Sequence, residues 1–192
     1  TILLMACVLF AGVGFAVLLT TLTWNREYRE LESRVGSLAR LMAERGTYFV
    51  PTLTVYDLLV AHGREWGLDD HSLAKLDMVG RLGRRALELA YRAGVKIASG
   101  ADIVGPAQAL KGRELAIKAE VLGAMGAIVA TTKTNAELLN VSDRLGTVEP
   151  GKWADLIVVR GNPLEDITLF EDGRKNVLLV MKEGRIMKDA LG

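Results

Sequence analysis

The sequence RAGVKIASGAD occupies residues 92–102 and decides how the rest of the chain is interpreted. A helical pattern ends at Gly94, a short apolar strand follows, and Asp102 stands just after that strand. The same order of helix, glycine and strand occurs earlier, where a helical pattern ends at Gly46 and a β-rich run covers residues 47–53. Two such units in succession predict βα repetition and a parallel sheet, in either a doubly wound fold or a (β/α)8 barrel.

The remaining pattern is mostly helical up to residue 140. Apolar residues recur at helical spacing over residues 70–93, and Asp69 or Asp70 can cap the start of that helix. Helical patterns also cover residues 113–139, with a break near Gly123. Two visible strands cannot close a barrel, because closure needs eight.

The last part of the chain, residues 141–192, has the composition of a small antiparallel β unit. The run ADLIVV at residues 154–159 predicts a strand. Further along, Glu183-Gly184 is a favourable two-residue turn between two short β-rich runs, which predicts a hairpin.

Residues 1–24 contain no charged side chain. At about 1.5 Å per residue, a helix of this length just crosses a hydrocarbon core of about 30 Å. Trp24 suits a membrane interface, and Arg26 follows it. We expect an apolar N-terminal helix that acts as a membrane anchor or signal-like segment. The protein is then membrane-anchored or exported. If the segment does not act in this way, we expect a cytoplasmic protein. The alternative is a buried helix of a larger protein.

Composition excludes several kinds of function. The formal net charge of +1 provides no basic excess, so we expect no nucleic-acid partner. The single cysteine, Cys7, excludes an intramolecular disulfide and a cysteine-based zinc cluster. The two histidines, His62 and His71, are expected at the surface or at a helix start. The sequence contains no GxxxxGK[ST], GxGxxG or GxSxG motif.

Asp102 is the strongest candidate for chemistry. Side chains just past the carboxyl ends of parallel strands line the active sites of such folds. A carboxylate there can bind a metal and take a proton from water. The alternative is an aspartate that only forms a turn.

Several longer strings resemble the amidohydrolase superfamily, and in particular its imidazolonepropionase-like and Xaa-Pro dipeptidase-like branch. The resemblance extends over about residues 38–190, and the combination of GTVEPGKWADLIVV with an upstream Gly-x-Asp is specific. The matching strings are LMAERGTYFVPTLTVYD, RAGVKIASGADIVGP, KGRELAIKAEVLGAMGAIVATTKTNAELL and DRLGTVEPGKWADLIVVRGNPLEDITLF.

This resemblance implies a partial TIM-type (β/α)8 barrel over residues 25–140 and, over residues 141–192, the C-terminal β unit of a composite β-sandwich. It implies metal-dependent hydrolysis of a C–N bond, such as that of an Xaa-Pro dipeptide, with zinc or another divalent metal. Asp102 matches the aspartate that serves as metal ligand and proton shuttle. Tyr56 matches a tyrosine that faces the substrate, with a structural tyrosine as the alternative.

The departures from the family are equally specific. The sequence has no His-x-His, and a later histidine ligand would fall near Glu30. One carboxylate cannot hold a catalytic zinc, which needs three protein ligands. We therefore expect that this chain alone neither retains zinc nor hydrolyses substrate. Three explanations stay open. In the first, a missing half-barrel from a partner chain or from upstream sequence completes the site. In the second, the chain is a non-catalytic, membrane-tethered interaction module that forms homo-oligomers, and in the third, residues 1–37 result from a shifted reading frame or a gene fusion.

Two further matches are predicted to be structural. Arg113 and Glu114 are expected to serve the fold or to form a solvated ion pair. Asp155 is expected to hold the edge of a strand.

Overall fold

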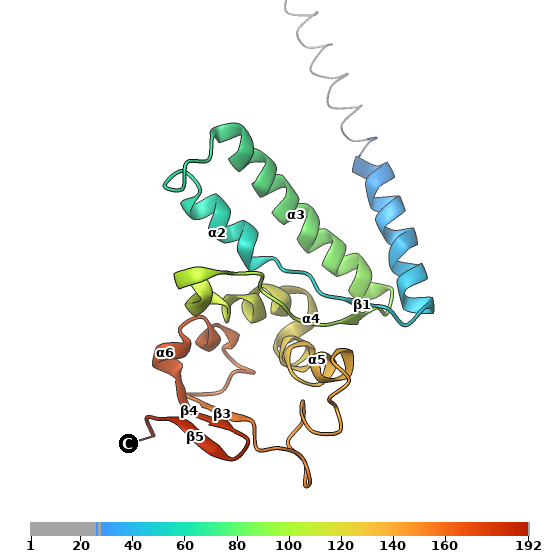
Figure 1. The fold of residues 1–192 in the computed structure, drawn as a ribbon. Helices are drawn as coiled ribbons and strands as arrows, with labels where there is room; N and C mark the ends of the chain where they lie inside the picture. The colour runs from blue at the N-terminus through green and yellow to red at the C-terminus, as the bar shows by residue number, and fades with distance from the viewer. Residues whose placement is uncertain (1–25, 27, 192) are drawn as a thin grey trace, which may run out of the picture.

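The computed structural model describes residues 26 and 28–191, so the predicted apolar helix of residues 1–24 lies outside the described part (Figure 1). None of the helices in the described part is long and apolar enough to cross a membrane. A helix over residues 28–44 comes first. The elements after it are β1 (Tyr48–Phe49), α2 (Thr54–His62), α3 (Asp70–Arg92), β2 (Lys96–Ile97), η1 (Gly105–Leu110), α4 (Arg113–Thr131), α5 (Lys133–Leu138), β3 (Leu156–Val159), η2 (Ile167–Phe170), α6 (Gly173–Asn176), β4 (Val177–Lys182) and β5 (Arg185–Asp189).

The first sheet confirms the predicted parallel pairing. Strand β1 pairs with β2 in parallel, with Tyr48 opposite Lys96 and Phe49 opposite Ile97. The connection between them runs through α2 and α3, which lie side by side on one side of the strands (Figure 1). Two parallel strands in the described residues do not make a barrel, so the barrel itself stays a prediction.

Local signals explain where α3 begins and ends. The Asp69 side chain accepts a hydrogen bond from the Ser72 backbone N–H at 2.7 Å, so Asp69 is the cap of the two predicted candidates, Asp69 and Asp70. The chain leaves the helix at Gly94, where φ is +81° and glycine carries no steric cost.

The described core lies between the first helix, α3, α4 and the two parallel strands. The centre of this core consists of apolar side chains with almost no solvent exposure. Burial of each of the larger side chains stabilises the folded state by about 1.5–3 kcal/mol. The buried members are Ala39, Leu53, Leu87, Ala90, Val95, Ile97 and Ile117. This packing fixes the strands against α4, which carries the groups described below.

The C-terminal unit is the predicted antiparallel sheet, with strand order β3-β4-β5. The hairpin turn has φ of +49° at Glu183 and +76° at Gly184, as a tight turn of the predicted kind requires. This unit contacts the start of α4 through η2. A Cβ atom at Gly112 would lie 1.8 Å from the carbonyl oxygen of Phe170, so only glycine permits this contact.

Candidate functional site

Asp102 lies between β2 and η1, just past the carboxyl end of the strand, as predicted. Its side chain is exposed and its backbone is left-handed, with φ of +52°. A non-glycine residue in this region is uncommon, and aspartate is among the few that tolerate it. The backbone therefore turns sharply at the residue that the sequence singles out.

Asn135, on α5, anchors the strand that leads to Asp102. Its side-chain Oδ1 accepts the Ser99 backbone N–H at 2.8 Å, and its Nδ2 donates to the Ser99 carbonyl oxygen at 2.9 Å. One amide side chain thus makes both hydrogen bonds that a neighbouring strand would otherwise make. The position of Asp102, three residues further on, depends on this contact.

Glu114 holds the carboxyl end of β1 in a similar way. Its carboxylate accepts the backbone N–H of Leu53 at 3.1 Å and that of Thr54 at 2.8 Å, and also the Thr54 hydroxyl at 2.6 Å. Lys118, one turn further along α4, donates to Glu114 and to the carbonyl oxygen of Pro51. A carboxylate at the first N–H groups of a helix is also favourable for the helix dipole.

The burial of Glu114 and Lys118 shows whether they form a structural contact or a solvated ion pair. Glu114 is 1% exposed and Lys118 is 0% exposed. Burial lowers the pKa of the Lys118 ammonium, and the neighbouring Glu114 carboxylate opposes that shift. Among the described residues, every buried side-chain nitrogen and oxygen has a hydrogen-bond partner. Glu114 is therefore structural, not part of a solvated ion pair.

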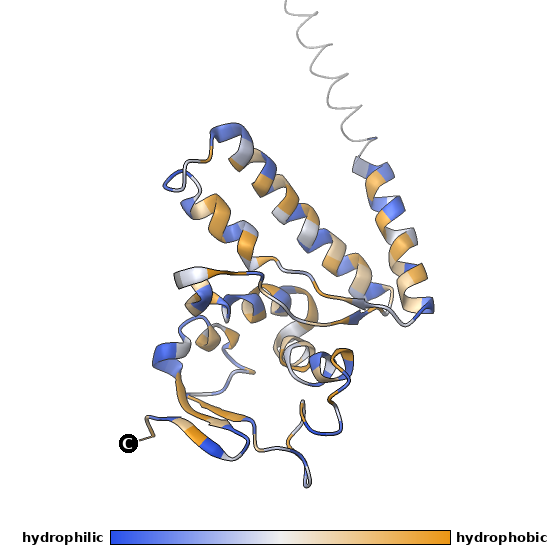
Figure 2. Ribbon diagram, in the orientation of Figure 1, coloured by the Kyte–Doolittle hydropathy of each residue, from blue (hydrophilic) through white to orange (hydrophobic). Residues whose placement is uncertain are grey.

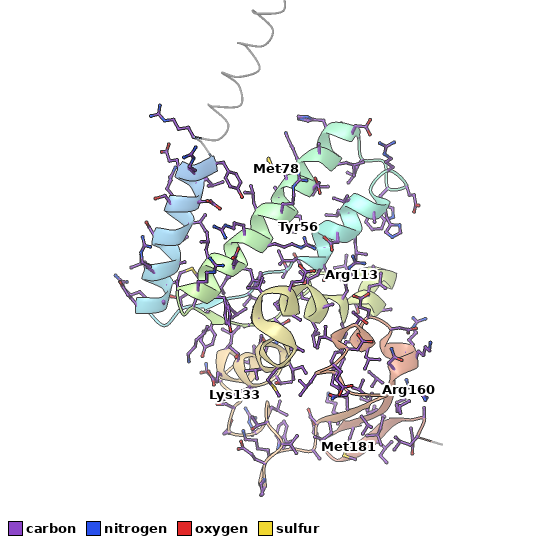
Figure 3. All side chains as sticks on the ribbon, turned by 180° about the vertical axis from the view of Figure 1, so that it is seen from behind. Tyr56, Met78, Arg113, Lys133, Arg160 and Met181 are labelled. Carbon is purple, nitrogen blue, oxygen red and sulfur yellow. The ribbon has the colours of Figure 1, made fainter. Side chains whose placement is uncertain are left out.

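Tyr56 lies in the first turn of α2, two residues after Thr54. It lines a cavity of about 230 Å³ between α2, α3 and the start of α4, and Figure 3 shows it near Arg113. Its Cβ packs close to Gly80, where an added Cβ would lie 3.3 Å away. Asp102 does not line this cavity. The role of Tyr56 towards a substrate stays a prediction.

An ion network borders the same cavity. The Asp57 carboxylate accepts from Arg84 at 2.9 Å and lies 3.4 Å from Arg113. Arg84 also lies 3.8 Å from Glu120. The network joins α2, α3 and α4, and sequence analysis missed it because its members are far apart in the chain. Arg113, at the start of α4, is the one member that the sequence pattern singled out.

The described residues do not fit a metal ion. No group of three His, Cys, Asp or Glu side chains within them could hold one. His62 lies 3.5 Å from Glu65 and stacks on Trp66, and His71 is exposed in the first turn of α3. Both histidines are at helix ends and at the surface, as predicted. Asp102 is left as a single candidate ligand.

Parallel βα units with a left-handed aspartate at the carboxyl end of a strand define an α/β protein with its candidate site at that edge. Residues 26–187 match the model of the amidohydrolase family. The chain therefore belongs to the amidohydrolase family. Members of this family are generally metal-dependent.

The chain is also similar to individual proteins and solved structures. Over 151 residues the chain is 34% identical to ochratoxinase of Aspergillus niger, which covers 77% of this chain and 31% of that protein. It is 41% identical to a prolidase crystallised with N-methylphosphonate-L-proline, with a TM-score of 0.74 over 80% of this chain and 38% of that one. It is also 37% identical to a Xaa-Pro dipeptidase with bound methionine in the active site. That comparison has a TM-score of 0.67 and covers 78% of this chain and 36% of that one. The chain thus spans about a third of the length of these relatives.

Proposed function

We propose that the chain serves the hydrolysis of an amide bond, by contributing Asp102 to a site that other polypeptide residues complete. The observation that carries this proposal is the position of Asp102, exposed and left-handed just past the carboxyl end of β2. The two hydrogen bonds between Asn135 and the backbone of Ser99 fix the end of the strand that leads to Asp102.

Asp102 supplies a carboxylate that can accept a proton from an attacking water molecule. A positioned acid or base of this kind contributes about 10²–10⁴-fold to a rate. Because no second or third ligand lies near it within the described residues, we derive no step through a metal ion. The remaining ligands would come from a partner half-barrel or from residues outside these 192.

The relatives suggest the substrate class. Two are named for action on proline-containing dipeptides, and one was crystallised with an N-phosphonylated proline. We infer that the substrate is a small molecule with an amide bond, such as an Xaa-Pro dipeptide.

A second candidate is a non-catalytic interaction module. It is favoured by the single carboxylate and by exposed apolar side chains such as Val148 and Ile157 in the C-terminal part. This candidate predicts that Asp102 can be replaced without any effect on what the chain binds.

Metal analysis separates the two candidates. The purified chain is mixed with the whole part of a family prolidase that precedes the region matched by this chain and that carries its His-x-His. Bound zinc is measured for each part and for the mixture. The first candidate predicts stoichiometric zinc in the mixture only, and its loss with Asp102→Asn. Two results would overturn the first candidate. One is an associated mixture without bound zinc, and the other is bound zinc that Asp102→Asn leaves unchanged.

A further inference from the structure

Helix α5 contacts β2 at both ends of the strand. Asn135 makes its two hydrogen bonds to the backbone of Ser99 at the carboxyl end. Glu137, two residues further along α5, accepts a hydrogen bond from the Lys96 ammonium at 3.2 Å, at the first residue of the strand. The Lys96 side chain is 53% exposed, and an ion pair at the surface contributes little. The connection between α5 and β2 therefore depends mainly on Asn135.

The turn at Gly146 packs closely against α5. A Cβ atom at Gly146 would lie 2.5 Å from the Cβ of Ala136, which is buried. It would also lie 3.2 Å from both the Cα of Lys133 and the carbonyl oxygen of Thr132. The φ of +93° at Gly146 is a second reason for glycine at this position. Asn135 lies between Lys133 and Ala136 in the sequence, so the turn contacts the part of α5 that anchors β2.

This turn belongs to a loop that is tied to α5 and closed on itself. The Val141 backbone N–H donates to the carbonyl oxygen of Ala136 at 2.9 Å, in the last turn of α5. The Trp153 backbone N–H donates to the carbonyl oxygen of Arg144 at 2.9 Å, and the Arg144 guanidinium lies 5.1 Å from the centroid of the Trp153 ring. The loop leads into the C-terminal sheet, whose strands β3 and β4 are hydrophobic along most of their length (Figure 2). It therefore joins that sheet to α5.

We propose that Gly146 and Asn135 are positioning residues for Asp102. The Gly146 turn fixes α5, and α5 fixes the end of β2 through the two hydrogen bonds of Asn135. The role of Asp102 rests on the proposed function, whereas the coupling from Gly146 to the end of β2 does not. In this way the C-terminal unit sets the geometry of a site that lies well upstream in the sequence.

Amide hydrogen exchange of the 192-residue chain, measured residue by residue by NMR, tests this coupling without substrate or metal. Rates are taken relative to the Thr54 amide, which Glu114 holds at 2.8 Å, so that a general loss of stability cancels. Gly146→Ala places a methyl group against α5 and should speed exchange at Ser99 by about 2–13-fold, the factor that one net hydrogen bond contributes. Gly151→Ala is the matched control, because φ is +88° there but an added Cβ would meet nothing within 4 Å. It should leave the relative rate at Ser99 unchanged.

A double variant tests the route through Asn135. In an Asn135→Ala background, Gly146→Ala should speed exchange at Ser99 no further, because the connection is already lost. The amide resonance of Asp102 should shift in each single variant and stay in place in Gly151→Ala. Three results would overturn the proposal: unchanged exchange at Ser99 in a folded Gly146→Ala chain, an equal effect of Gly151→Ala, or a full effect of Gly146→Ala without Asn135.

If Gly146→Ala does not fold, Asn135→Ala tests the coupling from the other end, because coupling between two sites is reciprocal. Exchange at the Val141 amide, which is bonded to Ala136, should then be faster than in the parent chain, and an unchanged rate would contradict the proposal. The two proposals fail separately. Unchanged exchange contradicts only the positioning, and activity that Asp102→Asn leaves intact contradicts only the proposed function.

Discussion

The carboxylate of Glu114 accepts hydrogen bonds from both the backbone N–H and the hydroxyl of Thr54, sixty residues earlier in the chain. Both residues are buried. The contact joins the first turn of α4 to the first turn of α2. It holds the carboxyl end of β1 in place, on the same edge of the sheet where Asp102 follows β2.

Glu114→Gln should lower the free energy of unfolding by about 3–5 kcal/mol, because it leaves the buried Lys118 charge without its partner. Urea denaturation measures this change. Glu120→Gln is the control on the same helix, because its side chain is 63% exposed and should change stability by less than about 1 kcal/mol. Equal effects of the two substitutions would show that the Glu114 contact does not hold the fold.

Lys118 should make stability rise with pH on the alkaline side. Burial lowers its pKa in the folded protein below the ordinary value of 10.5, so the unfolded chain binds more protons between these two pKa values. Stability rises with pH wherever the unfolded state binds more protons. The unfolding free energy of the parent, relative to Lys118→Met, should therefore increase as the pH rises towards 10.5. A relative free energy that stays constant or falls in this range would refute the assignment.

Asn135→Asp should loosen the end of β2. The carboxylate can still accept the Ser99 N–H but cannot donate to the Ser99 carbonyl, and one unsatisfied group costs about 1–3 kcal/mol. Hydrogen exchange at the Ser99 amide should be faster in Asn135→Ala, where both bonds are lost. Asn162→Ala, in an exposed turn, should leave it unchanged. Unchanged exchange in Asn135→Ala would mean that other contacts hold the strand.

Asp102→Gly should be neutral or stabilise the fold by up to about 1 kcal/mol, because glycine adopts the left-handed backbone without steric cost. Asp143 is a matched exposed turn residue outside the positive-φ set, so Asp143→Gly should be destabilising by about 0.4–1 kcal/mol, because glycine raises the conformational entropy of the unfolded chain. Thermal unfolding of the two variants measures the difference. Equal losses would show that Asp102 is held by contacts of its side chain.

The sequence predicted the elements whose signals are local. The parallel strands, the Asp69 cap, the hairpin at Glu183-Gly184 and the break at Gly123 were all predicted, and Gly123 has φ of +73° inside α4. Strand β3 was predicted two residues too long at its start. In each case the residue that determines the structure lies inside or next to the element.

The sequence did not predict α2, for a physical reason. The cap residue Leu53 provides no side-chain hydrogen bond of its own. The first N–H groups of the helix are instead satisfied by Glu114, sixty residues away, which no local pattern contains. The anchor that Asn135 gives to Ser99 was missed for the same reason. The position of Asp102 was predicted, and the contacts that fix it were not.

The central claim is that Asp102 belongs to an amide-hydrolysing site that other residues complete. The most direct test is the rate of Xaa-Pro dipeptide hydrolysis by this chain after mixing with the whole part of a family prolidase that precedes the region matched by this chain. We predict that activity appears only in the mixture, and that Asp102→Asn reduces it by about 10²–10⁴-fold whereas Asp143→Asn does not. An associated mixture without activity, or with activity that Asp102→Asn leaves intact, would contradict the claim.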